Sequence, residues 1–254
     1  MKLIKEKKLH LASILFFFLT LTSFSLNFDQ IDNLIIKHQN LDIHEKLVSY
    51  STLLLDKNYK ENVLIGSATD DEKLTIDLDN LDCFTYVEYV YALAISNSQK
   101  DFKSNVISLR YEDNIISFYN RNHFFTDWAD NNNLERISND KKINKILNKK
   151  DINKKYLKGI PLKNKLVYYE DINTRDYTKL KDKVYVVGIL SNSQGLDVSH
   201  VGFLIINDDD LRFRHASSKK KYRKVVDEDF LEYIDNKPGI IIYKFLGDSN
   251  GRFN

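Results

Sequence analysis

The feature that most constrains the fold of this chain is the order of its sequence patterns. Residues with helical periodicity come first, and strand-like runs of β-branched and aromatic residues come last, at 184–190, 200–206, 211–215 and 239–245. The Asn-Asp-Asp-Asp segment at 207–210 separates the second and third runs, as a hairpin turn does. Helices followed by an antiparallel meander predict an α+β fold with helices packed on an antiparallel sheet.

The first part of the chain carries the helical patterns. Apolar residues recur every three to four positions in four segments, which predicts helices at 28–38, 43–55, 82–96 and 100–109. Asp42 and Glu45 have the spacing of a capping box at the start of the second helix. Less regular segments predict a short strand at 115–119 and a surface excursion over 131–165 with a short helix at 141–147.

The amino terminus has the organisation of a secretory signal. Four lysines precede a mostly apolar run over 9–21, and Ser23 and Ser25 follow at the spacing of a cleavage site. The run is shorter than the ~20 residues that a spanning helix needs. We therefore expect a signal peptide at 1–25, one domain at 26–254, and an exported protein, periplasmic or secreted. Membrane contact is expected only if the signal is not cleaved and stays as an anchor.

Charge and cysteine content limit the possible partners of the protein and the possible sources of its stability. The net charge of +2 gives no indication of nucleic acid as a partner. A single cysteine excludes an intramolecular disulfide, so stability must come from a core. We expect a monomer.

The single cysteine, Cys83, stands where a helix is predicted to start, and two histidines follow in strand-like runs, His200 and His215. This is the pattern of a thiol hydrolase, in which nucleophile and base meet in space and not along the chain. A helix amino terminus and a nearby imidazolium lower the pKa of a thiol. The hairpin would bring both imidazoles onto neighbouring strands.

Two other interpretations of these residues stay open. Cysteine is often a small buried hydrophobe, and the histidines could be structural. The two histidines could also bind zinc with Cys83 or Asp197, although their spacing matches no compact metal motif. We therefore expect no metal and no cofactor.

The segment 121–128 mixes charged and aromatic residues, among them Arg121, His123 and Trp128. Aromatic faces can pack on a sugar, and arginine can pair with a carboxylate. The segment is therefore either the wall of a substrate cleft or a loop that its aromatic residues anchor in the core.

Several short stretches together carry a resemblance to a known family. The stretch 78–88 around Cys83 resembles the nucleophile motif of the NlpC/P60 cysteine peptidase superfamily, and more closely its N-acetylmuramoyl-L-alanine amidase-like branch. Further stretches that look like this branch follow in the same order at 109–111, 121–128, 195–202, 214–218 and 239–243. The turn at 112–114 departs from the pattern, and residues 131–165 match it poorly.

The resemblance implies a papain-like α+β core with its nucleophile at a helix amino terminus. It implies that Cys83 is the nucleophile, His200 the general base and His215 the residue that orients the base. The implied substrate is peptidoglycan or a muropeptide, cut at the amide between N-acetylmuramic acid and L-Ala. Candidate substrate contacts are Arg121, His123, Trp128 and Asp197.

Three alternatives to this activity remain. The first is a γ-D-glutamyl-diamino-acid endopeptidase with the same fold, because only pocket shape selects the bond. The second is a non-catalytic protein that binds the cell wall, and the third is a zinc amidase.

Overall fold

The structure is a computed structural model that describes residues 28–246, except 139, 173–174 and 209. The predicted signal peptide at 1–25 lies outside the described residues. Across the described ranges, no helix combines the length and the apolar character needed to cross a membrane.

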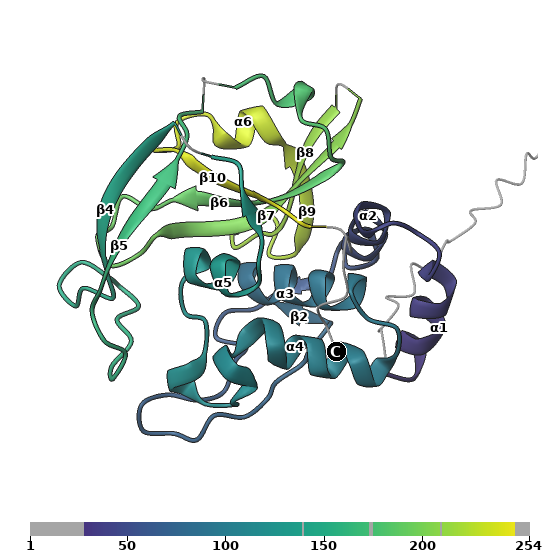
Figure 1. Cartoon of the computed structure of the whole chain (residues 1–254), viewed down its shortest axis with the longest axis horizontal. Helices are drawn as coiled ribbons and strands as arrows, with labels where there is room; N and C mark the ends of the chain where they lie inside the picture. The colour runs from purple at the N-terminus through teal and green to yellow at the C-terminus, as the bar shows by residue number, and fades with distance from the viewer. Residues whose placement is uncertain (1–27, 139, 173–174, 209, 247–254) are drawn as a thin grey trace, which may run out of the picture.

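A six-stranded antiparallel sheet forms the centre of the fold (Figure 1). Its order is β3-β10-β6-β7-β8-β9, and every neighbouring pair is antiparallel. The strands are β3 (Glu135–Arg136), β6 (Val184–Leu190), β7 (Val198–Asn207), β8 (Asp210–Ala216), β9 (Val225–Asp229) and β10 (Ile240–Lys244). All four strand-like runs of the sequence are therefore strands, as predicted. The hairpin of β7 and β8 closes at Asn207 and Asp210.

The helices lie mainly on one face of this sheet (Figure 1). They are α1 (Phe28–His38), α2 (Ile43–Leu53), α3 (Cys83–Ala94), α4 (Gln99–Arg110) and α5 (Phe125–Asn131), whereas α6 (Phe230–Ile234) covers the opposite face. The four predicted helices are confirmed within about two residues at each end. The mixed α+β architecture, helices against an antiparallel sheet, is also confirmed.

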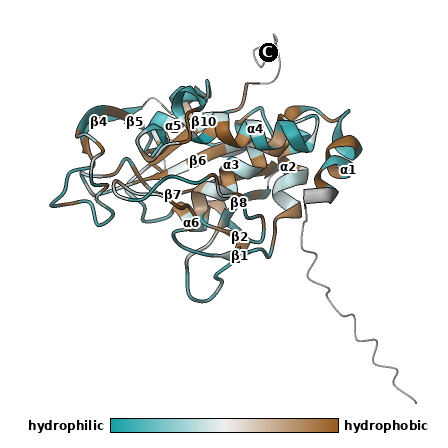
Figure 2. Cartoon of the chain, turned by 90° about the horizontal axis from the view of Figure 1, so that it is seen from below, coloured by the Kyte–Doolittle hydropathy of each residue, from teal (hydrophilic) through white to brown (hydrophobic). Residues whose placement is uncertain are grey.

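The pleat of β7 divides its side chains between two apolar cores. Val201, Phe203 and Ile205 face the α1–α5 layer, and Leu204 and Ile206 face α6. Because side chains alternate along a strand, His200 points to the α6 side with Leu204. Figure 2 shows hydrophobic residues concentrated where α3, β6 and β7 meet.

Local capping fixes where helices α2 and α3 begin. Asp42 and Glu45 form the expected capping box at α2. At α3, the Asp82 carboxylate accepts from the backbone amides of Phe84 and Thr85, and Thr85 completes a second capping box. These bonds satisfy amides that a helix start leaves without partners.

Two predicted elements are wrong. Residues 115–119 form no strand, because the chain turns into a short 3₁₀ helix, η2 (Phe118–Asn120), capped by Ser117. Residues 141–147 are not a helix but strand β4 (Lys141–Leu147), which pairs with β5 (Lys163–Tyr169) in a separate hairpin. The remaining small elements are β1 (Asn58–Tyr59), β2 (Asn80–Leu81), η1 (Glu112–Asn114) and η3 (Tyr177–Lys179).

Candidate active site

The two strand histidines form a direct pair. His200 Nε2 lies 2.7 Å from His215 Nδ1, with the two rings perpendicular at 90° and their centroids 4.8 Å apart. His200 comes from β7 and His215 from β8, on the α6 side of the sheet. The proximity expected from the hairpin is therefore confirmed.

A carboxylate extends this pair. His215 Nε2 lies 2.9 Å from Glu228 Oε2, and Lys219 Nζ donates to Glu228 Oε1 over 2.8 Å. Glu228 comes from β9, next to β8 in the sheet. The sequence reasoning missed this residue, because β9 is short, acidic and was not predicted. A Val-Val-Asp-Glu-Asp run after a turn was the available signal.

The carboxylate determines which nitrogens carry protons. An ionised carboxylate can only accept a hydrogen bond, so His215 Nε2 donates to Glu228. In a neutral imidazole the other nitrogen is then an acceptor, so His215 Nδ1 accepts from His200 Nε2. His200 Nδ1 is consequently left without a proton and is free to act as a base.

Both imidazoles are held neutral by their surroundings. Burial, assisted by the Lys219 ammonium, lowers the pKa of His215 to about 3. Burial also lowers the pKa of His200 well below its ordinary value, with further contributions from His215 and Lys219. A base must be unprotonated before it can accept a proton, and both shifts favour that state.

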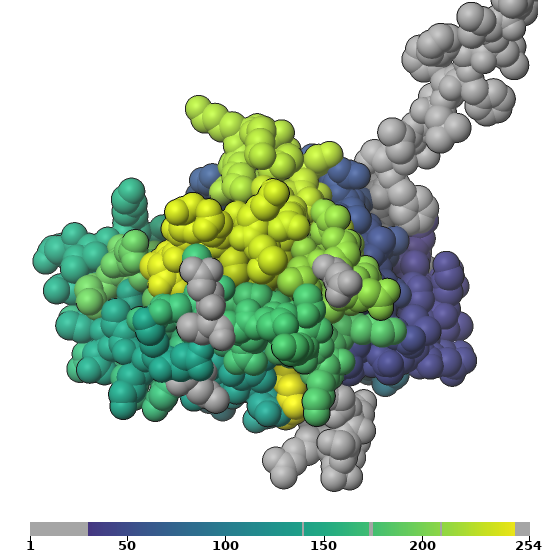
Figure 3. All heavy atoms as spheres, turned by 90° about the horizontal axis from the view of Figure 1, so that it is seen from above, coloured from purple at the N-terminus to yellow at the C-terminus, as the bar shows by residue number. Residues whose placement is uncertain are grey.

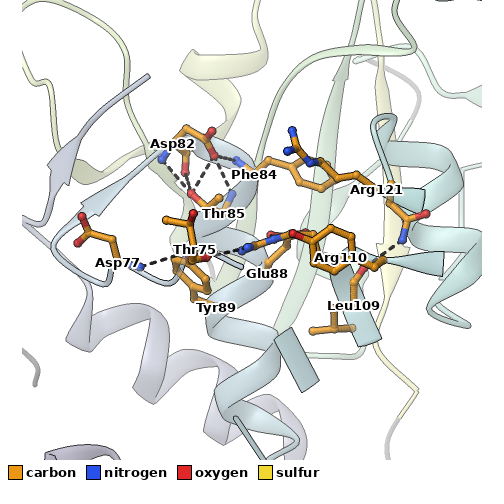
Figure 4. A network of polar contacts seen from close by, with 12 residues as sticks. Thr75, Asp77, Asp82, Phe84, Thr85, Glu88, Tyr89, Leu109, Arg110 and Arg121 are labelled. Carbon is orange, nitrogen blue, oxygen red and sulfur yellow. Dashed lines mark hydrogen bonds and ion pairs between the residues drawn. The ribbon is translucent and has the colours of Figure 1, made fainter. Parts of the chain in front are cut away.

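Cys83 is the first residue of α3, directly after the Asp82 cap. Phe84 and Thr85 donate their amides to Asp82 Oδ1 at 3.0 and 2.8 Å (Figure 4). Asp82 does not cap the Cys83 amide, and the backbone amides of Cys83 and Val201 both act to lower the pKa of the thiol. Val201 directly follows His200 in β7, so the folded chain brings the thiol to the start of the strand that carries the base.

The thiol is not activated in the way the sequence reasoning expected. Burial, and then the Asp82 carboxylate, raise the pKa of Cys83 to about 12, although the two amides and Lys155 act in the opposite direction. Burial and the Asp82 carboxylate therefore outweigh the lowering of the thiol pKa that was expected from the helix amino terminus. A neutral thiol therefore needs a base that removes its proton during the reaction.

Two hollows adjoin these residues. The first, of about 650 Å³, is lined by Cys83 and by Tyr59, Ser67, Phe118, Arg121, Lys155, Tyr156 and Lys158, among others. The second, of about 470 Å³, is lined by His200 and by Ser191, Leu196, Tyr233 and Lys237, among others. Lys155 lines both hollows. In the view from the α6 side, the yellow surface of α6 and its neighbours lies next to the teal region that contains β4 and β5 (Figure 3).

Arg121 and His123 occupy different places. Arg121 lines the first hollow, but its guanidinium is bonded to the buried carboxylate of Glu72, which the Tyr111 hydroxyl also approaches at 2.7 Å. His123 Nε2 lies 2.7 Å from the Phe118 carbonyl, and burial lowers the pKa of His123 to about 4. His123 lines neither of the two hollows.

The structure corrects the placement of two expected substrate contacts. Trp128 has 0% exposure and packs against Phe84 and Phe125, so it offers no surface to a ligand. Asp197 is 2% exposed and accepts from the amide and hydroxyl of Thr126 at 2.7 and 2.9 Å, which fixes the start of α5. Both residues belong to the interior.

The described part of the chain contains no group of three or more His, Cys, Asp or Glu side chains that could hold a metal ion. The zinc alternative therefore finds no ligand set there.

Solved structures share this fold. A structure of an N-acetylmuramoyl-L-alanine amidase from Bacteroides uniformis ATCC 8492 is 25% identical, covers 80% of this chain and 98% of its own, and has a TM-score of 0.67. A putative xylanase from Bacteroides fragilis is 28% identical, with 78% and 99% covered and a TM-score of 0.66. Protein LPG0564 from Legionella pneumophila str. Philadelphia 1 is 23% identical, with 85% and 93% covered and a TM-score of 0.70, which shows a likeness of fold.

Among curated protein sequences, none matches this chain. A family model described as N-acetylmuramoyl-L-alanine amidase-like matches residues 49–240, a range that includes Cys83, His200, His215 and Glu228. By this match, the chain belongs to the N-acetylmuramoyl-L-alanine amidase-like (AmiA-like) family.

Proposed function

We propose that this protein is a cysteine-dependent amidase that hydrolyses the amide between the lactyl group of N-acetylmuramic acid and L-Ala in peptidoglycan or its fragments. The observation that carries the proposal is the chain of hydrogen bonds from Glu228 through His215 to His200, which leaves His200 Nδ1 free as a base. The backbone amide of Val201, the residue next to that base, acts on the Cys83 thiol and lowers its pKa. Family membership supplies the substrate class.

The reaction begins with proton transfer from the Cys83 thiol to His200 Nδ1 while sulfur attacks the lactyl carbonyl carbon. When the tetrahedral intermediate collapses, the C–N bond breaks and His200 returns the proton to the nitrogen of L-Ala. Water then attacks the thioester, and His200 accepts its proton. Release of the lactyl carboxylate restores the thiol, with the proton returned from His200 to sulfur.

Two features of the site suit the charge that develops. The Cys83 amide, which Asp82 leaves uncapped, can donate to the oxyanion of the intermediate. The imidazolium formed on His200 is stabilised through His215 by the Glu228 carboxylate. The high pKa of the resting thiol means that general-base catalysis, and not a preformed thiolate, starts the reaction.

The proposal includes the papain-like NlpC/P60 type of core and export from the cytoplasm. A helix that begins at Cys83 packs against an antiparallel sheet that carries both histidines, as this type of core requires. Export rests on the signal-like residues 1–25 and places the protein in the periplasm or outside the cell.

The test is digestion of purified muropeptides by the full chain, with the fragments identified by mass spectrometry. The amidase releases a peptide with a free L-Ala amino terminus and an intact N-acetylmuramic acid. Cleavage after D-Glu instead would identify the γ-D-glutamyl endopeptidase. Because one structural relative is described as a putative xylanase, xylan serves as a second substrate, and we expect no cleavage of it.

The matched control is Cys83→Ala. We expect a folded protein with no amide hydrolysis, and loss of wild-type activity with a thiol alkylator but not with a chelator. Wild-type turnover by Cys83→Ala would refute the thiol mechanism.

A further inference from the structure

The long loop that joins β4 and β5 (Figure 1) is closed by its own hydrogen bonds. Asn148, fully buried, holds it closed: its side-chain nitrogen donates to the carbonyls of Leu157 and Ile160 at 2.9 and 2.7 Å. The Asn148 side-chain oxygen accepts from the Leu157 amide at 2.8 Å. One side chain thus satisfies three backbone groups of the loop.

The same loop is fastened to the segment 191–195, which borders the hollow at His200. The Gly195 carbonyl accepts from the Asn148 amide at 2.8 Å and from the Asn153 side chain at 3.3 Å. A Cβ atom on Gly195 would lie 2.1 Å from the Asn153 Cβ, so only glycine permits this approach.

A buried lysine completes the attachment. Lys145 is 2% exposed, and its ammonium donates to the carbonyls of Ser191 and Ser193, the latter at 2.9 Å. Burial of a lysine is costly unless its protons are bonded, and here two carbonyls bond them. The loop and the 191–195 segment therefore form one fixed wall.

This wall presents Lys155 at the edge of both hollows. The Lys155 amide donates to the Asn153 side chain at 2.8 Å, which sets the backbone at this position. The Lys155 side chain lines both the hollow at Cys83 and the hollow at His200, and its charge acts on the thiol. Lys155 thus borders both the hollow of the proposed nucleophile and the hollow of the proposed base.

The charges around the first hollow leave this lysine available. Arg121 is paired with Glu72, and Glu61 is paired with Arg223 at 3.2 Å. Throughout the described residues, neither Lys155 nor its neighbour Lys158 has an acidic partner. Asp82 also lines this hollow, and its carboxylate accepts from the amides of Phe84 and Thr85. The ammonium groups of Lys155 and Lys158 therefore supply the unpaired charge of the hollow, which suits a substrate with a carboxylate close to the bond that is cut.

We propose that Lys155 binds the first free carboxylate of the stem peptide and makes the enzyme prefer stems whose second residue is D-isoglutamate over those with D-isoglutamine. This inference rests on the amidase activity proposed above. The lactyl and L-Ala carboxyl groups are both in amide bonds, and D-Glu is linked through its γ-carboxyl, so its α-carboxylate is the first anion beyond the cleaved amide. Amidation of that carboxylate removes the charge and the acceptor that an ammonium favours.

The experiment compares N-acetylmuramoyl-L-Ala-γ-D-Glu-L-Lys, in which the γ-carboxyl of D-Glu is in a peptide bond, with its counterpart in which the α-carboxyl of D-Glu is amidated. We expect the wild-type protein to cleave the acid with a kcat/KM roughly tenfold higher, as for one charge-assisted hydrogen bond. Lys155→Gln should abolish the preference, because only the cleavage of the acid becomes slower. Lys155→Arg should keep most of the preference, and high salt should reduce the preference of the wild-type protein. Lys150→Gln removes an exposed charge from the same loop and should behave as wild type.

Binding provides a readout without turnover. Calorimetry with Cys83→Ala should show tighter binding of the acid than of the amide, and the added Lys155→Gln change should remove the difference. Equal kcat/KM values for the two substrates, or a preference that survives in Lys155→Gln, would overturn the role of Lys155 and leave the amidase activity standing. Failure of the wild-type protein to cut either substrate would instead refute the proposed function, and the inference with it.

Discussion

His200 Nε2 and His215 Nδ1 lie 2.7 Å apart, so the hydrogen bond between these two imidazoles occupies Nε2 of His200. In the proposed reaction, the other nitrogen of His200, Nδ1, takes the proton of the thiol. The pair can work only as a unit. His215 keeps the proton of His200 on Nε2, and this leaves Nδ1 basic.

We predict that substitutions in this pair are strongly non-additive. His200→Ala removes the base and should cost roughly 10²–10⁴-fold in kcat, the usual contribution of general acid–base catalysis. The double variant with His215→Ala should be little worse, because His215 acts only through His200. Steady-state kinetics of both single variants and the double variant check this. If the loss of kcat in the double variant equalled the product of the losses in the two single variants, the assignment of His200 and His215 to one unit would be wrong.

Glu228 should influence the rate without contacting substrate. Glu228→Ala removes the acceptor that fixes the tautomer of His215, so kcat should fall about tenfold or more while KM stays unchanged. Glu228→Gln keeps an acceptor oxygen and should lose less. Kinetics at several pH values, with a melting curve for each variant, provide the measurement. A normal kcat for Glu228→Ala would show that the carboxylate has no part in the reaction.

Lys219 should set the acid limit of activity. Its ammonium is among the causes that lower the pKa of both His200 and His215, so Lys219→Met should raise both pKa values. The imidazoles then become protonated at a higher pH, and the acid limb of the kcat/KM profile should move to higher pH. Lys220→Met, also exposed, is the control and should leave the limb in place. A movement to lower pH would contradict this electrostatic role.

The sequence predicted those parts of the site that depend on local patterns. The start of α3 is local, because Asp82 caps the helix two residues ahead of Phe84. The neighbourhood of His200 and His215 is also local, since one tight hairpin pairs their strands. Glu228 was missed because its role arises only when β9 pairs with β8, and only Val225 and Val226 in its acidic run are typical of a strand.

Other misses have equally specific physical causes. Ile143, Ile146 and Leu147 have the spacing of a helix face, yet pairing with β5 and the bonds of buried Lys145 produce a strand. Trp128 lies in an aromatic-rich segment whose composition suits a ligand wall and a core equally well. Its complete burial on α5 depends on tertiary packing that periodicity does not encode.

Gly202 provides a steric test of the histidine pair. An added Cβ would lie 2.8 Å from His215 Cβ and 2.8 Å from the Arg214 carbonyl, which is backbone and cannot move aside easily. Gly202→Ala should therefore destabilise the protein by about 1–3 kcal/mol, as overpacking does, and also displace His215 and lower kcat. Phe203→Leu, on the other face of β7, is the matched control that should lower stability alone. Comparable kcat values for the two folded variants would show that the close approach is not important for activity.

Arg121 separates a structural role from a substrate contact. Its guanidinium is bonded to Glu72, whose side chain is 2% exposed, so Arg121→Ala leaves a buried carboxylate with only the Tyr111 hydroxyl as a partner. Breaking a buried ion pair costs roughly 3–5 kcal/mol, and we expect a clear fall in the melting temperature with a near-normal KM for the folded fraction. Replacement of both members, in Arg121→Gln with Glu72→Gln, removes the unpaired charge and should recover part of the stability. Thermal unfolding and steady-state kinetics of the single and double variants decide between the roles. A raised KM at an unchanged melting temperature would instead place Arg121 among the residues that bind substrate.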